Sequence, residues 1–97
     1  MEDKFSSAKA MEDKYALLMY FVYILQSLKD NTKYVGLTIN IKKRIKDHNN
    51  GKSKYTKGHM PWKLIWCCIF YNKTKAGKFE KYLKSGSGTS FMNNHLV

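Results

Sequence analysis

The chain has 97 residues, a length that suits one domain with a single hydrophobic core. Its formal net charge is +11, and residues 21–97 hold fifteen basic side chains against three acidic ones, which favours nucleic acid over an anionic membrane surface as partner. No apolar run reaches the roughly 20 residues of a membrane span. The histidines are scattered and the chain has no C-x-x-C motif, so we do not expect a zinc site. Cys67 and Cys68 are adjacent in an apolar run, so we expect buried free thiols and a cytoplasmic protein.

Residues 1–19 contain the tetrapeptide MEDK twice and are predicted to be a partly disordered leader, which leaves residues 20–97 as a single domain. The domain begins with YFVYILQ, a turn built on Asp-Asn, and KYVGLT, a pattern typical of a β-hairpin. On the second strand Tyr34 and Gly36 share one face, and Gly36 leaves room for the close approach of a ligand or another backbone.

A helix is predicted to follow the hairpin, from an Asn40 N-cap to about Asn49, with Gly51 as a left-handed C-cap. Spacings of three and four place four residues on one helix face: Ile41, Arg44, Ile45 and His48. Arg44 is the only arginine among 18 basic residues. Its planar fork suits bidentate phosphate contact better than a lysine does, although an arginine and a histidine at this spacing are in most proteins plain surface residues.

The segment after this helix is basic and carries one aromatic residue, which is typical of a mobile surface loop. By itself it reads as a solvated loop, but beside Arg44 it favours contact with a phosphate backbone. The residues that we expect to bind substrate are Gly36, Lys43, Lys52, Lys54 and Lys57.

The run WKLIWCCIFY at residues 62–71 is apolar on both faces, apart from one lysine, and predicts a central strand covered on both sides. Asn72 is a suitable cap for a helix to about Lys84, on which Ala76, Phe79 and Leu83 face inward. Glu80, the only glutamate after residue 13, borders this inward stripe, so it must be paired, for example with Lys84, or bound to a cation. Ser-Gly-Ser-Gly then ends the helix, and residues 89–96 are expected to form a short last helix.

Several motifs stand in a fixed order along the domain. They are Val22-Tyr23-Ile24, Tyr34-Val35-Gly36, the R-x-x-x-H pair Arg44 and His48, PWKLIW from Pro61, and the helix KFEKYLK with Glu80. With these motifs, the chain between about Phe21 and Phe91 resembles the GIY-YIG nuclease superfamily. It is similar to the small single-domain members, which resemble the N-terminal module of the bacterial excision-repair incision nuclease, a likeness that suggests a role in DNA repair.

The resemblance implies an α+β fold in which a three-stranded antiparallel sheet is flanked by helices. It also implies a metal-dependent endonuclease acting on nucleic acid, DNA in preference to RNA. The sequence does not fix the oligomeric state, and a monomer is the expectation. Glu80 would bind one Mg²⁺ or Mn²⁺, Arg44 would hold the scissile phosphate, and Tyr23 would be the general base, with Tyr34 and His48 positioning water or sharing the proton. The alternative is a nucleic-acid-binding module of the same fold without turnover.

One departure from the family pattern concerns the proton acceptor. Many relatives carry a lysine directly after YIG, where this chain has Leu37. Without that charge, Tyr23 needs another source of a lowered pKa, or His48 takes the proton instead, and the sequence leaves the choice open. The family's C-terminal asparagine is matched only weakly, by Asn93 or Asn94.

Overall fold

The computed structural model describes residues 19–97, so the predicted leader, except for Met19, lies outside the described residues. The elements in chain order are β1 (Tyr20–Ser27), β2 (Lys33–Thr38), α2 (Ile41–Asn49), the 3₁₀ turn η2 (Lys57–His59), β3 (Trp62–Phe70), α3 (Lys73–Lys84), α4 (Gly86–Phe91) and the π-helical turn η3 (Met92–Leu96).

The three strands form one antiparallel sheet in the order β2-β1-β3. With helices packed on the sheet, this confirms the predicted α+β class and the hairpin. The prediction of a central strand at residues 62–71 was wrong, because β1 lies in the middle and β3 is an edge strand. An apolar run indicates that both faces of a strand are covered by other parts of the protein. It does not indicate whether the strand is hydrogen-bonded to neighbours on one edge or on both, and this determines the strand order.

A β-bulge explains why β3 is apolar on both sides. The register against β1 shifts between Ile24 and Leu25, so that Ile24 lies opposite Trp66 while Leu25 lies opposite Leu64. An extra residue in one strand reverses the facing of every side chain beyond it. The two ends of β3 therefore contribute to opposite faces of the sheet, and Cys67, which we expected to be buried, is exposed.

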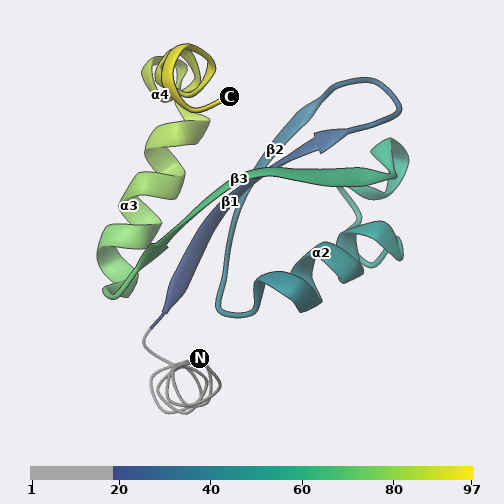
Figure 1. Cartoon of the computed structure of the whole chain (residues 1–97), viewed down its shortest axis with the longest axis horizontal. Helices are drawn as coiled ribbons and strands as arrows, with labels where there is room; N and C mark the ends of the chain where they lie inside the picture. Colours follow the sequence, from purple (N-terminus) through teal and green to yellow (C-terminus); the bar gives the residue numbers. More distant parts are fainter. Residues whose placement is uncertain (1–18) are drawn as a thin grey trace, which may run out of the picture.

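The sheet lies between α2 and the helices α3 and α4 (Figure 1), and it separates two hydrophobic clusters. One lies against α3, α4 and η3 and contains Val22, Ile24, Val35, Ala76, Leu83 and Met92. The other lies against α2 and is built on Tyr23, Leu25 and Trp62, with Ile41 and Ile45 packed on it. The two faces of β1 thus serve different helices, as its alternating pattern predicts. In the part of the chain that the structure describes, no helix is long and apolar enough to cross a membrane.

The helices begin and end close to where the sequence places them. Asn40 caps α2 by accepting from the Lys43 amide, and Asn72 caps α3 in the same way. Gly51 follows α2 at φ 73, in the left-handed region. The final helix starts earlier than predicted, at Gly86, because the Ser85 hydroxyl ends α3 and accepts from an amide of α4.

Candidate active site

The predicted catalytic residues lie around the β2 edge of the sheet, where α2 and α3 approach from opposite faces. Tyr23 and Tyr34 come from neighbouring strands, with ring centroids 6.3 Å apart. The Tyr34 ring also lies edge-on to His48 of α2, at 5.0 Å, and the Lys84 ammonium of α3 lies 5.6 Å from its centre. One tyrosine therefore connects the two helices that carry the other candidates.

A chain of hydrogen bonds runs from Tyr23 through His48 to Thr56. The Tyr23 hydroxyl lies 2.9 Å from His48 Nε2, and His48 Nδ1 lies 2.7 Å from the Thr56 hydroxyl. The Thr56 hydroxyl also lies 3.4 Å from the Ser53 carbonyl oxygen, and with its proton directed there it accepts from Nδ1–H of His48. His48 Nε2 is then the acceptor for the Tyr23 O–H, and the histidine is held in one tautomer.

Burial sets the protonation states of this chain. Both Tyr23 and His48 are nearly or fully inaccessible to solvent, at 1% and 0% exposure. Burial raises the pKa of Tyr23 to about 12, against a smaller lowering by polar contact with Arg44. Burial, together with the positive charge of Arg44, lowers the pKa of His48 below its ordinary 6.5. At neutral pH the pair is therefore a neutral phenol donating to a neutral imidazole.

Gly36 provides the space that the Tyr23 ring occupies. The two residues are direct partners across β1 and β2. A Cβ at position 36 would lie 2.2 Å from the Tyr23 hydroxyl oxygen and 2.3 Å from Cζ, far inside van der Waals contact. We expected a close approach at Gly36 by a ligand or a backbone, and the structure places a side chain of the site there instead.

Arg44 lies one helical turn before His48 on α2 and is also in polar contact with Tyr23. Polar contact with the Tyr23 hydroxyl is the largest cause that raises the pKa of Arg44, and Tyr34 adds to it. The residue is half-buried and also borders a depression of about 360 Å³ at the N-terminal end of α2. Its guanidinium is thus charged, held beside two hydroxyl groups and reachable from solvent.

Glu80 brings a carboxylate to the same region from α3. Its side chain is 21% exposed and forms an ion pair of 3.0 Å with Lys84, one helical turn later. Its negative charge is close enough to be one of the causes raising the pKa of Tyr23. The pairing with Lys84 that the sequence allowed is thus present, and the Glu80 charge is near enough to Tyr23 to contribute to its raised pKa.

The donor set at Glu80 fits a hard divalent cation held mainly by substrate and water. Within residues 19–97, no three His, Cys, Asp or Glu side chains converge as a complete cage would require. Mg²⁺, however, is commonly held by one or two carboxylates together with phosphate oxygens and water. Glu80 is therefore suited to hold Mg²⁺ or Mn²⁺ with a phosphate already in place.

The lysines predicted to bind substrate do not all lie free in solvent. Lys43 and Lys52 both pair with Asp47, at 3.1 and 3.8 Å, although their side chains remain about two-thirds exposed. Lys54 and Lys57 are exposed in the segment after α2. Lys43 lies on α2 and the other three lie in the segment after it, and their contact with substrate stays a prediction.

The loop that carries Thr56 is fixed at its base. The Asn49 side chain donates to the Trp62 carbonyl at 3.0 Å and accepts from the Trp62 amide at 2.6 Å, which closes the loop at residues 49 and 62. The Trp62 indole donates to the Thr56 carbonyl at 2.9 Å. We expected a mobile surface loop, but Thr56 is fully buried. No local pattern singles out this threonine, because its partner is eight residues away on α2.

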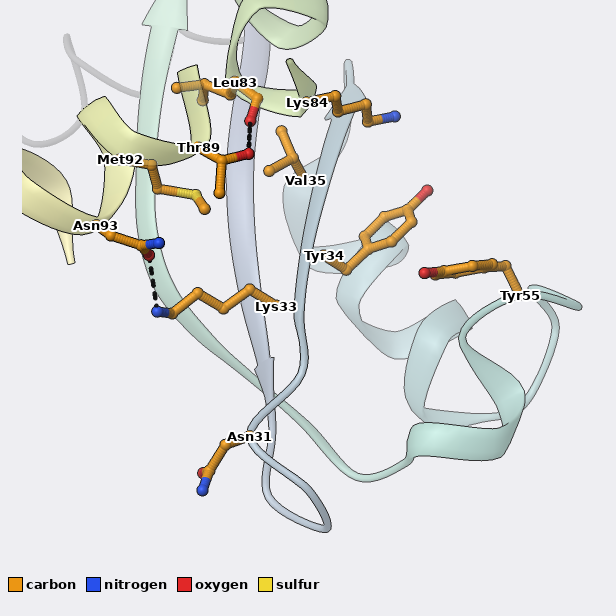
Figure 2. Close-up of a pocket in the computed structure, with 10 residues that line it drawn as sticks. All are labelled: Asn31, Lys33, Tyr34, Val35, Tyr55, Leu83, Lys84, Thr89, Met92 and Asn93. Carbon is orange, nitrogen blue, oxygen red and sulfur yellow. Dashed lines mark hydrogen bonds between the residues drawn. The ribbon is translucent and has the colours of Figure 1, made fainter. Parts of the chain in front are cut away.

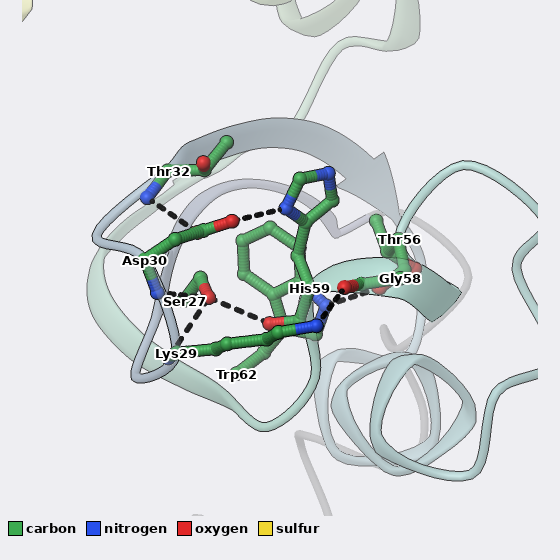
Figure 3. A network of polar contacts seen from close by, with 8 residues as sticks. All are labelled: Ser27, Lys29, Asp30, Thr32, Thr56, Gly58, His59 and Trp62. Atoms are coloured by element: carbon green, nitrogen blue, oxygen red, sulfur yellow. Dashed lines mark hydrogen bonds and ion pairs between the residues drawn. The ribbon is translucent and has the colours of Figure 1, made fainter.

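A second set of contacts ties the same segment to the turn of the β1–β2 hairpin (Figure 3). Ser27 donates to the His59 carbonyl at 2.6 Å, and the Asp30 carboxylate lies 2.6 Å from His59 Nδ1. Hydrogen bonding to His59 is the largest cause that holds the pKa of Asp30 well below its usual range. The position of Thr56, and through it of His48, is thus set from two sides.

Comparison with known proteins identifies the family of this chain. A family model described as the GIY-YIG catalytic domain matches residues 19–94. A UPF0213 protein of Clostridium perfringens is 49% identical over 67 residues, or 68% of this chain and 71% of the relative. The UPF0213 protein YazA of Bacillus subtilis is 42% identical over 66 residues, or 67% of this chain and 66% of the relative. The solution NMR structure of a UPF0213 protein from Bacillus halodurans is 34% identical, with a TM-score of 0.49 and coverage of 78% of this chain and 83% of that one. By the match to the family model and the identity to these relatives, the chain belongs to the GIY-YIG domain family, and its relatives there are UPF0213 proteins.

Proposed function

We propose that this protein is a metal-dependent endonuclease that hydrolyses phosphodiester bonds in nucleic acid, with DNA preferred over RNA. One observation carries the proposal: the Tyr23 hydroxyl lies 2.9 Å from a histidine nitrogen whose opposite nitrogen is held by Thr56, beside the only arginine of the chain. Hydrolysis needs a proton acceptor next to a cation that holds phosphate, and this arrangement supplies both.

The proton path that we propose uses both candidates for the base. Tyr23 takes a proton from the attacking water while it passes its own proton to His48 Nε2, so His48 is the net acceptor. A free tyrosinate is not needed, which agrees with the pKa of Tyr23 near 12. Since Tyr23 is 1% exposed, we place the water on the side where Arg44 contacts the Tyr23 hydroxyl and Tyr34 contacts Arg44.

The charged residues hold and stabilise the phosphate. Arg44 places its fork on two phosphate oxygens and opposes the charge that develops on them. Glu80 would hold the divalent ion, which when bound supplies polarisation of the phosphate and stabilisation of the leaving oxygen. Binding the ion requires the Glu80 carboxylate to exchange its contact with Lys84, at 3.0 Å, for the metal.

The test is cleavage of labelled single-stranded, duplex and branched DNA and RNA with Mg²⁺, with Mn²⁺ and with a chelator. Glu80→Ala, Arg44→Ala and Tyr23→Phe are each expected to slow cleavage by about 10²-fold or more. Lys78→Ala, on the exposed surface of α3, is the matched control and should cleave like the unaltered chain. Cleavage that none of the three substitutions reduces would refute the assignment.

The Glu80–Lys84 ion pair favours one second candidate, a nucleic-acid-binding module of the same fold without turnover. In that protein the carboxylate would be permanently neutralised by Lys84. It predicts binding that weakens steeply with salt, survives Glu80→Ala, and yields no product with any divalent metal. Product formation that depends on both Glu80 and metal excludes it.

A further inference from the structure

A cavity of about 670 Å³ opens beside the candidate active site (Figure 2). It lies between the β2 edge and the C-terminal part of the chain, and the proposed reaction uses only Tyr34 of its lining. The other residues that line it are Asn31, Lys33, Val35, Tyr55, Leu83, Lys84, Thr89, Met92 and Asn93. Its volume suffices for a planar group of one or two rings, in the range of small-ligand sites.

The cavity has an aromatic wall and an apolar floor. Tyr55 is 67% exposed, and its ring centroid lies 5.8 Å from that of Tyr34 at an interplanar angle of 38°. Val35, Leu83 and Met92 form a floor of buried apolar side chains. A tyrosine that is mostly exposed to solvent contributes little to the packing of the core. Exposed aromatic rings of this kind are the surfaces on which nucleobases stack.

The rim of the cavity is positive and rich in amides. Lys33 and Lys84 are its two charged residues, and none of the ten residues that line it is acidic. The Lys33 ammonium donates to the Asn93 amide oxygen at 3.0 Å, which leaves the Asn93 nitrogen as a donor. A group that combines a flat ring, polar edges and a nearby phosphate is complementary to these three features, and a nucleotide is such a group.

We propose that this cavity receives one unpaired base of the nucleic-acid strand, next to the phosphate held at Arg44. The inference rests on the proposed function, because Tyr34 belongs to both the active site and the cavity and so places the base beside the scissile position. Tyr55 stacks on the base, Lys33 and Lys84 neutralise the flanking phosphates, and Asn93 contacts the edge of the base. A fully paired strand cannot fill the cavity, so the site selects nucleic acid with an unpaired nucleotide.

Binding to Glu80→Gln, which is expected to cleave too slowly to interfere, provides the test. The probes are a blunt DNA duplex and the same duplex with a short single-stranded tail at either end, each with 2-aminopurine at the junction. Stacking on tyrosine should quench 2-aminopurine in one tailed probe. Adding Tyr55→Ala should weaken binding of that probe about tenfold and remove the quenching, as expected for loss of one stacking ring, with little change for the blunt duplex. Tyr71→Ala, at another tyrosine that is 72% exposed, is the matched control and should behave like its parent.

Two results would overturn the inference. If Tyr55→Ala weakens binding of blunt and tailed probes equally, Tyr55 contacts the phosphate backbone and not a base. If binding and quenching of both tailed probes are unchanged, no base binds in the cavity. Cleavage by the unaltered chain is measured separately and decides the proposed function. If the unaltered chain cleaves and Tyr55→Ala has no effect on the tailed probes, only the base site is refuted. If Tyr55→Ala removes the stacking preference but the unaltered chain does not cleave, only the nuclease assignment is refuted.

Discussion

Gly36→Ala is a single added methyl group that acts directly on the candidate proton acceptor. The new Cβ would lie 2.2 Å from the Tyr23 hydroxyl oxygen, where ordinary contact begins at 3.4 Å. The strand backbone is fixed by pairing with β1, so the Tyr23 ring has to move. Its hydrogen bond of 2.9 Å to His48 Nε2 then breaks, because the ring shifts by more than such a bond tolerates.

The magnitude follows from two costs. Overpacking a filled core position costs about 1–3 kcal/mol, and leaving the buried His48 nitrogen without a partner costs about 1–3 kcal/mol more. We therefore expect the free energy of unfolding to fall by about 2–6 kcal/mol, a large share of the 5–15 kcal/mol typical of a domain. Urea denaturation followed by tyrosine and tryptophan fluorescence measures it, and cleavage should fall together with stability.

A double-mutant cycle separates this steric cause from the others. In a Tyr23→Leu background the hydroxyl and Cζ are absent, so adding Gly36→Ala should cost less than about 1 kcal/mol. An equal cost in both backgrounds would refute the steric explanation. Unchanged stability of Gly36→Ala, with weaker nucleic-acid binding, would instead support the role in substrate binding that the sequence suggested for Gly36.

Three further predictions concern the histidine. The folded-state pKa of His48 lies below 6.5, so the unfolded chain binds the proton first as pH falls. The free energy of unfolding should therefore decrease as pH falls from about 6.5 through the folded-state pKa. Urea titrations across this range should show that His48→Gln removes this pH dependence of stability. The cleavage rate should rise with pH through a pKa below 6.5 and then stay level across neutrality, because Tyr23, with a pKa near 12, does not titrate there. A further change in the rate with a midpoint above about pH 7 would contradict proton transfer from Tyr23 to His48. Thr56→Val leaves Nδ1–H of His48 without an acceptor and should cost about 1–3 kcal/mol and slow cleavage, whereas Thr56→Ser should retain both properties.

The sequence predicts the elements that local signals define. The helix α2 begins and ends where Asn40 and Gly51 place its caps, and its spacing brings Arg44 and His48 to one face. Alternation along β1 correctly assigns Tyr23 and Val22 to opposite sides of the sheet. These features depend on contacts within a few residues, so a single sequence contains them.

The remaining features depend on pairings between distant parts of the chain. The apolar composition of β3 could not reveal that it pairs on one edge only, or that a bulge reverses its faces. Thr56 looks like any polar loop residue until the loop folds back on His48. The occupant of the space at Gly36 is a tyrosine from the neighbouring strand, and only the register of the hairpin identifies it.

The two hydrogen bonds between Asn49 and Trp62 have a consequence for how substrate preference can change. They join the entry and the exit of the loop, so exposed side chains between them can be exchanged while the helix and the strand on either side stay joined. Within this segment, Thr56 provides the side chain that contacts the His48 ring. If the proposed function holds, exchanging the exposed Lys52, Lys54 and Tyr55 should therefore change which nucleic-acid structure is bound, while the contacts between Tyr23, His48 and Thr56 stay as they are.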